Sequence, residues 1–354
     1  EINTMPSCPT VSNIQEYGLS TTETYLTWTL GYMETQWQVQ YDTNGFTLGN
    51  GTSFLASNDT VQITGLTSQT SYDFYVRGIC GVGDTSSWAG PYTVNTPCGL
   101  FVPNYLEDFN SSSDWLPNCW VGAEGGSPST GPTSYTNSGW YQENYINSSS
   151  NSSAATMNLY YTGSQYWLLS PQFDLSGGNF QLEFDFAITE YAYSTSEDMG
   201  SDDTVQVLVS NDFGSTWDVL ETWVDGSSYS NTGSHQAYLL NTYAGDTVQF
   251  AIWGSEGSTD DSEDYEVFID NFEVNSVNDD DLSAIAFVQP ATLCGDSNTP
   301  IQVVVQNLGA NAQTGFDVVV DWTGSTTGTI STTYTGTLNW NEFDTIAVDT
   351  LNTF

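Results

Sequence analysis

The segment QLEFDFAI, residues 181–188, places apolar side chains at every second position over most of its length. The same alternation recurs in DTVQVLVS (203–210) and DTVQFAIW (246–253). Because successive side chains of a β-strand point to opposite faces of a sheet, this period of two is typical of strands with one buried face. Further segments of this kind are TYLTWTL (24–30), WQVQY (37–41), YDFYVRGI (72–79), IQVVVQN (301–307) and FDVVVDW (316–322).

Clusters of Gly, Asn, Asp, Ser or Pro bound each of these segments, and no useful window shows the 3.6-residue apolar period of a helix. Many short strands at this spacing indicate sandwiches or barrels. The sequence therefore predicts an all-β protein of β-sandwich domains. Its 354 residues, 38 % of them hydrophobic, suffice for two or three domains with sizeable cores.

Two breaks divide the chain into three expected domains in series. The segment NTPCG (95–99) closes a first unit, and the acidic run NDDD (278–281) separates a long middle unit from the last. The predicted domains cover residues 1–97, 98–277 and 278–354. An acidic run of this kind is typical of a solvated linker, although linkers between sandwiches also bind calcium.

The charge balance of the chain is extreme. One basic side chain, Arg77, stands against 43 Asp and Glu residues, for a formal net charge of −42. Binding to phosphates needs Lys and Arg, so the composition excludes nucleic acid as a partner and disfavours anionic membranes. Self-repulsion at this charge predicts that salt or divalent cations stabilise the protein.

The five cysteines lie far apart, with no CxxC spacing and almost no histidine. This pattern favours disulfides in an oxidising compartment over zinc, so we expect an extracellular, secreted or cell-surface protein. No apolar run approaches 18 residues, and we expect no membrane insertion. The N-terminal EINTM lacks the regions of a signal peptide, which indicates that a signal was removed or that the true start lies upstream.

The first unit resembles a fibronectin type III domain. CPTVSNI fits the first strand of that family, and Trp28 and Trp37 lie on its second and third. ITGLTSQTSYDFYVRGICG carries Leu66 and Tyr72 at the spacing of the tyrosine corner, in which a phenol hydroxyl binds nearby backbone. The version with flanking cysteines is similar to modules in secreted proteins of the Bacteroidetes.

This resemblance implies a disulfide scheme. The first strand starts at the pole of the sandwich where the sixth strand ends, so Cys8 and Cys80 are expected to meet there. Cys98 and Cys119 then link the first unit to the second, and Cys294 is left over.

The middle unit resembles the MAM-related jelly-roll modules of surface proteins. The matching segments are YLEDF (105–109), WLPNCW (115–120), YWLLSPQFDLSGGNFQLEFDF (166–186) and EVFIDNFEV (266–274). In such modules the first and last strands meet, which implies a structural calcium site formed by Glu107, Asp108, Asp270 and Asn271. The Asp-rich turns EDMGSDD (197–203) and STDDSEDYE (258–266) are secondary candidates.

The last unit resembles an Ig-like surface module through PIQVVVQNLGANAQTGFDVVVDW (300–322). We count five strands, ending with TIAVDTL (345–351), where an Ig-like sandwich has about seven. The expectation is a C-terminally incomplete domain, completed by later residues of the same chain or by a strand from a neighbouring copy.

Catalytic chemistry finds little support. The single histidine, His235, is expected in a polar GSHQ turn, and the chain has no lysine for a Schiff base. Glu183 and Asp185 begin the E-x-D-x-x-E motif of one kind of jelly-roll glycosidase, but Ile188 occupies the third acidic position. The sequence predicts that this protein is not an enzyme.

Two further features leave alternatives open. Trp140 and Tyr141 lie in a Gly/Ser/Asn-rich loop and are the candidate glycan-binding pair. The alternative for the seven tryptophans of the middle unit is a packed core, where aromatics of sandwiches more often lie. Arg77 is expected opposite Trp88, either in a cation–π stack or by chance. The seven tryptophans are Trp115, Trp120, Trp140, Trp167, Trp217, Trp223 and Trp253.

Five segments join Asp-Thr to an aliphatic residue, which resembles the O-glycosylation motif of Bacteroidetes secreted proteins. The alternative is a turn Asp that precedes a β-branched strand. The threonines concerned are Thr60, Thr204, Thr247, Thr345 and Thr350.

Together these observations predict a non-catalytic structural or adhesive segment of an extracellular surface fibre or appendage. Disulfides and calcium stabilise it, and its partners are neighbouring copies in a homo-oligomer or cell-surface glycans. The alternative is a carbohydrate-binding module of a larger secreted enzyme.

Overall fold

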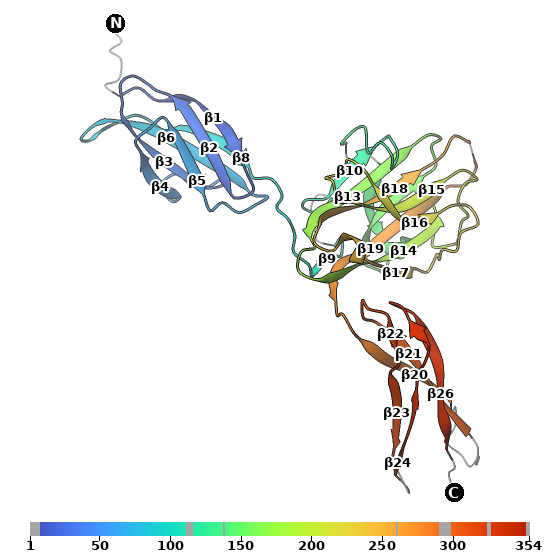
Figure 1. The fold of residues 1–354 in the computed structure, drawn as a ribbon. Helices are drawn as coiled ribbons and strands as arrows, with labels where there is room; N and C mark the ends of the chain where they lie inside the picture. Colours follow the sequence, from blue (N-terminus) through green and yellow to red (C-terminus); the bar gives the residue numbers. More distant parts are fainter. Residues whose placement is uncertain are drawn as a thin grey trace. The chain divides into compact units, whose positions relative to one another are not determined.

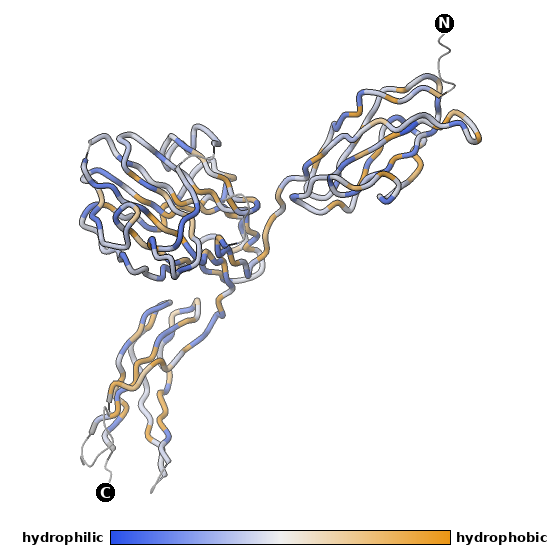
Figure 2. Tube along the Cα trace, turned by 180° about the vertical axis from the view of Figure 1, so that it is seen from behind, coloured by the Kyte–Doolittle hydropathy of each residue, from blue (hydrophilic) through white to orange (hydrophobic). Residues whose placement is uncertain are grey.

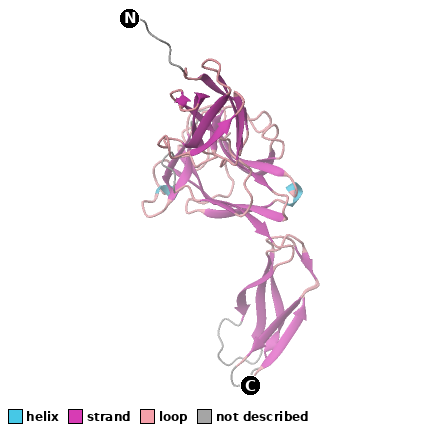
Figure 3. Cartoon of the chain, turned by 90° about the vertical axis from the view of Figure 1, so that its left-hand side faces the viewer, coloured by secondary structure: helices cyan, strands magenta, loops and turns pink. Residues whose placement is uncertain are grey.

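The computed structural model describes residues 8–110, 116–136, 139–259, 261–289, 299–323 and 327–351. Strands fill most of these ranges, and the two helical segments among them, η1 (Tyr145–Asn147) and η2 (Asn241–Tyr243), are single 3-10 turns (Figure 3). The predicted all-β fold of β-sandwich domains is confirmed. The chain divides into two compact units, residues 1–100 and 101–354.

The first unit consists of two antiparallel sheets. One has the strand order β1-β2-β5, and the other has the order β4-β3-β6-β7, with β8 also paired to β6 (Figure 1). Buried side chains from both sheets meet between them, among them Trp28 and Trp37, whose ring centroids lie 5.8 Å apart. The strands are β1 (Ser12–Leu19), β2 (Glu23–Thr29), β3 (Gln36–Thr43), β4 (Thr52–Ala56), β5 (Thr60–Thr64), β6 (Ser71–Gly81), β7 (Asp84–Thr85) and β8 (Ala89–Asn95).

A tyrosine at the start of β6 ties this strand to the preceding loop. The hydroxyl of Tyr72 accepts a hydrogen bond from the backbone N–H of Thr67 at 3.0 Å. Leu66, next to this loop residue, is buried against the same cluster as the Tyr72 ring. The contact is the tyrosine corner that the fibronectin type III resemblance implies.

In the second unit, residues 105–277 form two packed layers. One sheet has the order β10-β13-β18-β15-β16, and the other has the order β11-β12-β19-β14-β17, with β9 also paired to β19 (Figure 1). The strands are β9 (Tyr105–Glu107), β10 (Val121–Glu124), β11 (Trp140–Asn144), β12 (Ser153–Leu159), β13 (Gln165–Asp174), β14 (Asn179–Glu190), β15 (Thr204–Ser210), β16 (Asp218–Trp223), β17 (Ser234–Leu239), β18 (Thr247–Ser255) and β19 (Tyr265–Val277).

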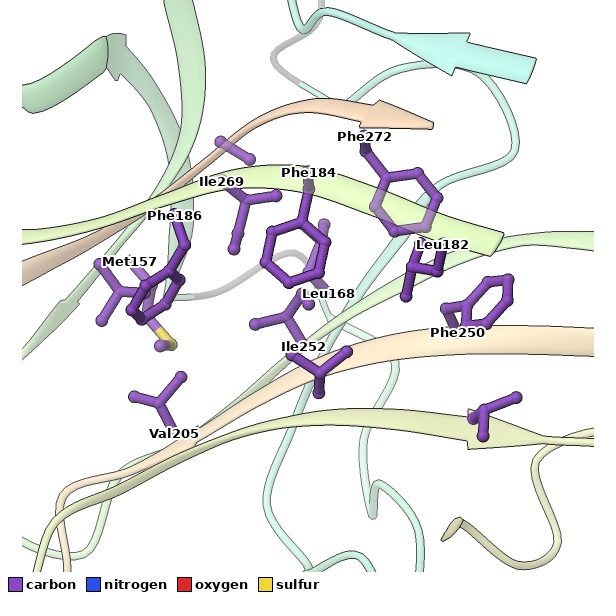
Figure 4. Close-up of a cluster of buried hydrophobic side chains, with 14 of the residues drawn as sticks. Met157, Leu168, Leu182, Phe184, Phe186, Val205, Phe250, Ile252, Ile269 and Phe272 are labelled. Atoms are coloured by element: carbon purple, nitrogen blue, oxygen red, sulfur yellow. The ribbon is translucent and has the colours of Figure 1, made fainter. Parts of the chain in front are cut away.

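The main core lies between these layers. Figure 4 shows Phe184 and Phe186 of β14 pointing toward the opposite sheet, where Ile252 and Val205 point back. All four side chains are at most 1 % exposed. The apolar positions of QLEFDFAI thus fill the core. Figure 2 shows hydrophobic and hydrophilic stretches alternating along the tube.

The outer faces of both sheets are also partly covered. Trp167, Trp217 and Trp253 form a second buried cluster on the β10–β16 sheet, and Phe268 packs with Ala187 on the other. All six described tryptophans of this part are buried, so the core interpretation of these aromatics holds for them. Trp115 lies outside the described residues.

The described residues from 282 onward form seven strands, where the sequence predicts five. Two of them are two-residue pairings, which are too short to leave an alternating pattern. The sheets have the orders β20-β21-β26, β22-β25 and β23-β24, around a core that includes Val303, Val320 and Ile346. The strands are β20 (Leu282–Gln289), β21 (Thr299–Asn307), β22 (Gln313–Thr314), β23 (Asp317–Trp322), β24 (Gly328–Thr333), β25 (Thr337–Leu338) and β26 (Phe343–Leu351).

Replacing Tyr72 with Phe is expected to destabilise the first unit by about 1 kcal/mol, because the N–H of Thr67 loses its acceptor. Hydrogen exchange of peptides from residues 60–80 across a urea series measures this free energy. Tyr17→Phe, at an exposed ring, is the control and should change it by less than about 0.5 kcal/mol. Equal values for the two variants would contradict the proposed tie.

Candidate metal centre

The first and last strands of the two-layer sandwich are neighbours. β9 pairs with β19, with Glu107 opposite Phe272. Asp270 and Asn271 lie on β19 immediately before this pairing, and Asp108 follows the end of β9. The four residues predicted as calcium ligands therefore lie at one corner of the sheet.

Asp270 is the most buried member of the group, with 3 % exposure. Its carboxylate accepts hydrogen bonds from the backbone N–H of Asn271 at 2.8 Å and from the Ser152 hydroxyl at 3.2 Å. Burial raises the pKa of Asp270 to about 6, despite these bonds, and the charges of Asp185 and Asp108 add to the rise. Negative charge therefore accumulates around Asp270.

The remaining carboxylates of the corner bind backbone locally. Glu107 accepts from the N–H of Phe109 at 2.8 Å, and Asp108 accepts from the N–H of Asn110 at 3.1 Å. Burial raises the pKa of Glu107, and the nearby Asp108 contributes to the rise. Both carboxylates thus already accept hydrogen bonds from the backbone of the turn that follows β9.

The chemistry of this corner fits calcium better than its arrangement does. Carboxylate and amide oxygens are hard donors of the type that Ca²⁺ prefers. Across the described ranges, however, no three His, Cys, Asp or Glu side chains are arranged to hold a metal ion. A cation here would rest on Asp108 and Asp270, whose charges interact directly, with other oxygens completing its shell.

Asp185 was absent from the predicted ligand set, although the structure pairs it with Asp270 across β14 and β19. A register shift between Glu183 and Asp185 produces this pairing. Asn271 also donates to Asp185 at 2.9 Å. Alternation within one strand carries no signal of a register shift against its neighbour, so sequence reasoning had no means of finding this contact.

His235 lies on strand β17, so its predicted place in a turn is wrong. Strand β17 has no fully buried face, so its sequence lacks the alternation of apolar and polar residues that indicates a strand. Nε2 lies 3.2 Å from Glu183 Oε1, and Nδ1 lies 3.2 Å from Asp185 Oδ1. Both carboxylates only accept hydrogen bonds, so both contacts require the protonated ring, which has no free nitrogen to act as a general base.

The predicted glycan-binding pair is half wrong. Trp140 is 2 % exposed and packs in the main core, because residues taken for a loop form strand β11. Tyr141, on the other face, is half-buried, and its hydroxyl donates to Glu266. It lines an open cleft of about 350 Å³ together with Asn147, Tyr191 and Glu266.

Glu266 was not singled out in the sequence, although it organises this cleft. Its carboxylate is 2 % exposed and accepts from Asn147 Nδ2 at 2.7 Å and from the N–H of Ala192 at 2.9 Å, besides Tyr141. Its place at the start of EVFIDN resembles that of any exposed strand residue. Its hydrogen-bond donors lie far away in the sequence, at 119 residues for Asn147, 125 for Tyr141 and 74 for Ala192. A local sequence pattern cannot indicate contacts at such separations.

A disulfide joins Cys8 and Cys80, with the Cα atoms 5.7 Å apart. Cys98 and Cys119 are disulfide-bonded as well. Cys294 lies outside the described residues.

Arg77 lies on β6 with its guanidinium 4.6 Å from the centre of the Trp88 ring. It also donates two hydrogen bonds to Gln38 Oε1, at 2.6 and 2.9 Å. The cation–π stack, one of the two alternatives that the sequence left open, is therefore present, and the only arginine of the chain is held on a strand surface.

The threonines of the glycosylation motif occupy strands. Thr60, Thr204 and Thr247 begin β5, β15 and β18, whereas Thr345 and Thr350 lie within β26. Thr60 and Thr345 are exposed, and the other three are half-buried.

Comparison with models of known protein families gives no match, and comparison with curated proteins gives none either. The solved structures that are similar include domains of Drosophila, human and bacterial origin. The FN5 domain of Drosophila Lar is 18 % identical, with 25 % of this chain and 96 % of that chain covered and a TM-score of 0.22. The fn3 domain of human collagen alpha-1(XX) chain is 17 % identical, with 27 % and 94 % covered and a TM-score of 0.24.

The third is the K1 cleaved adhesin domain of Lys-gingipain (Kgp) from Porphyromonas gingivalis W83. It is 13 % identical, with 49 % of this chain and 98 % of that chain covered and a TM-score of 0.32.

Within the described ranges, neither short helical turn approaches the length or apolarity that crossing a membrane requires.

The imidazole of His235 is expected to titrate above pH 6.5. Burial alone would lower its pKa, but the hydrogen bonds and charges of Glu183 and Asp185 raise it. Its protonated form therefore stabilises the fold fully below about pH 6.5, and this contribution is lost as the pH rises through the folded-state pKa. Because the chain has one histidine, a single set of imidazole NMR signals reports the titration.

Glu183→Gln should lower this pKa, because one of the two carboxylates is removed. Glu143→Gln is the control, since Glu143 is exposed on β11 at the opposite edge of the sheet. A histidine pKa that the two variants leave equally unchanged would contradict the bridge.

Proposed function

We propose that this chain is a non-catalytic structural or adhesive segment of an extracellular surface fibre or appendage. The observation that carries the proposal is that the side chains of the sandwiches pack the core or are held in hydrogen bonds. Apolar side chains fill the core between the layers and the clusters on their outer faces. The one histidine is held by two carboxylates and has no free ring nitrogen.

The clefts support the same conclusion. Two clefts of the two-layer sandwich are open, with volumes of about 350 and 290 Å³, and are lined mainly by polar groups and tyrosines. Disulfides at Cys8 and Cys80, and at Cys98 and Cys119, fit an oxidising compartment and therefore an extracellular location.

Four further elements belong to this proposal. Calcium at Glu107, Asp108, Asp270 and Asn271 would offset the charge at that corner, and exposed Thr60 and Thr345 are the most accessible positions for O-glycans. Self-association with neighbouring copies would need salt, calcium or apolar contacts, because a charge of −42 per copy opposes it. A pairing of Cys98 with Cys119 would limit flexing after the first unit.

A structural segment must bear tension, which single-molecule extension of the chain measures. We expect discrete force peaks as the sandwiches unfold. The Cys8–Cys80 disulfide spans 72 residues, so oxidised chains should release roughly 250 Å less contour length from the first unit than reduced chains.

The matched control is the double variant Cys8→Ser and Cys80→Ser, which should release the full length with or without reductant. Extension of the oxidised chain without any force peak would overturn the structural role.

A carbohydrate-binding module is the second candidate, and the cleft beside Tyr141 favours it. Tyr191 is 47 % exposed at this cleft, next to the amide of Asn147 and the carboxylate of Glu266. Sugar rings stack on such aromatic faces, and their hydroxyls accept hydrogen bonds from an amide N–H and donate to a carboxylate. This candidate predicts saturable binding of the chain on a glycan array.

Tyr191→Ala should then weaken glycan binding at least about tenfold, a loss of about 1.4 kcal/mol. Tyr161→Ala removes another exposed ring away from the cleft and is the control. Absence of glycan binding by the unaltered chain would leave the structural role alone.

A further inference from the structure

Two buried carboxylates face each other at one end of the two-layer sandwich. Asp203 immediately precedes β15, and Glu256 immediately follows β18. These strands are paired, with Thr204 opposite Ser255, so the two acidic residues are cross-strand neighbours at the end of the ladder. Asp203 is 2 % exposed and Glu256 is 1 % exposed.

One oxygen of each carboxylate has no partner. Asp203 Oδ2 accepts from the Tyr265 hydroxyl at 2.8 Å and from the N–H of Gly200 at 3.1 Å. Asp203 Oδ1 and Glu256 Oε2 are shielded from solvent and have no hydrogen-bond partner. Buried carboxylates of this kind are unfavourable unless a positive charge or a proton compensates them.

Two more carboxylates approach the same place from the flanking loops. A Cβ at Gly200 would lie 2.6 Å from Asp203 Oδ2 and 2.9 Å from Asp261 Oδ2, so the absence of a side chain lets both carboxylates come close. Gly257 does the same for Asp202, whose carboxyl a Cβ there would strike. Four acidic groups therefore converge on the end of the β15–β18 ladder.

The loops that carry them are already joined. Asp202 Oδ2 accepts from the N–H of Ser258 at 2.8 Å and from that of Thr259 at 3.2 Å. Asp261 accepts from the N–H of Ser201. Asp202 and Asp261 therefore fix the loop before β15 to the loop after β18. Both are close enough to Glu256 for their charges to act on it.

We propose that Asp203 and Glu256 hold a divalent cation, with calcium as the fitting species, at the end of the β15–β18 ladder. The donors are all oxygens, which excludes the nitrogen and sulfur sets typical of zinc. Calcium accepts six to eight oxygens in flexible arrangements, whereas magnesium demands near-ideal octahedral geometry.

In the described ranges no three acidic side chains already form a metal cage. Asp202, Asp261, backbone carbonyls or water complete the shell when the ion binds. The bound ion would lock the two loops together.

This site is separate from the calcium proposed at the terminal strands. Asp270 lies within β19, whereas Asp203 and Glu256 flank β15 and β18. The test therefore uses the whole chain carrying Asp270→Asn, so that a signal from the terminal-strand corner does not contribute. Calcium chloride is titrated calorimetrically at pH 8.5, above the value of about 8 to which burial and the neighbouring carboxylates raise the pKa of Glu256.

Glu256→Gln and Asp203→Asn should each weaken calcium binding by more than about tenfold. Without calcium, in EGTA, Glu256→Gln should melt at a higher temperature than its parent, because a buried uncompensated charge is gone. Loss of calcium binding together with higher stability in EGTA separates a ligand from a residue that merely supports the fold. Glu143→Gln, at an exposed residue of β11 in the other sheet, is the control and should bind calcium as the parent does.

Equal calcium affinity in Glu256→Gln and its parent would overturn the proposal. It would also be overturned if calcium did not bind at pH 8.5 while stability in EGTA fell as the pH rose from 4.5 to about 8. That result would show two carboxyl groups that share a proton.

Discussion

Forty-three carboxylates share this chain with one arginine and one histidine, so buried or half-buried acidic groups must find neutral donors. Asp73 shows how the fold meets this constraint. Its carboxylate accepts from the N–H of Gly45 and the amide of Asn44, both at 2.9 Å, and from the Thr93 hydroxyl at 2.6 Å. Burial acts to raise its pKa, but these three donors more than offset burial and hold the pKa below its ordinary value.

The same constraint explains where the candidate ion sites lie. Backbone and side-chain donors satisfy Glu266, which is almost fully buried, whereas Asp270 faces two other acids, and Asp203 and Glu256 keep unpartnered oxygens. A bound cation would compensate those carboxylates that lack enough N–H and O–H donors. The function proposed here depends on the same balance, because calcium or salt would set both the rigidity of each sandwich and its contacts with neighbouring copies.

Much of the fold was predictable because many of the strands bury every second side chain. QLEFDFAI and DTVQFAIW alternate along β14 and β18, and each sends its large apolar side chains into the shared core. The spacing of Leu66 and Tyr72 identified the tyrosine corner for a similar reason, since both ends of that contact lie within six residues. Features that depend on residues close together in the sequence could thus be predicted from the sequence.

The failures concern contacts between distant segments. Trp140 follows a Gly/Ser-rich stretch, yet pairing of β11 with β12 directs it into the core. His235 has polar neighbours, yet it lies on β17 between two acids from β14. Asp185 joins the predicted calcium corner through a register shift. Composition and alternation do not encode register between strands, and the polar site residues depend on register most.

The carboxyl ¹³C titration of the whole chain in EGTA tests the central claim most directly, because it reports each acidic group separately. Neutral donors should hold Asp73 below its ordinary pKa of 3.8, and burial among other carboxylates should raise Asp270 to about 6 and Glu256 to about 8. Asp73 would then stabilise the fold above pH 3.8 and lose this contribution as the pH falls, whereas Glu256 would destabilise the fold increasingly from pH 4.5 to about 8. Ordinary pKa values for all three groups would contradict the account.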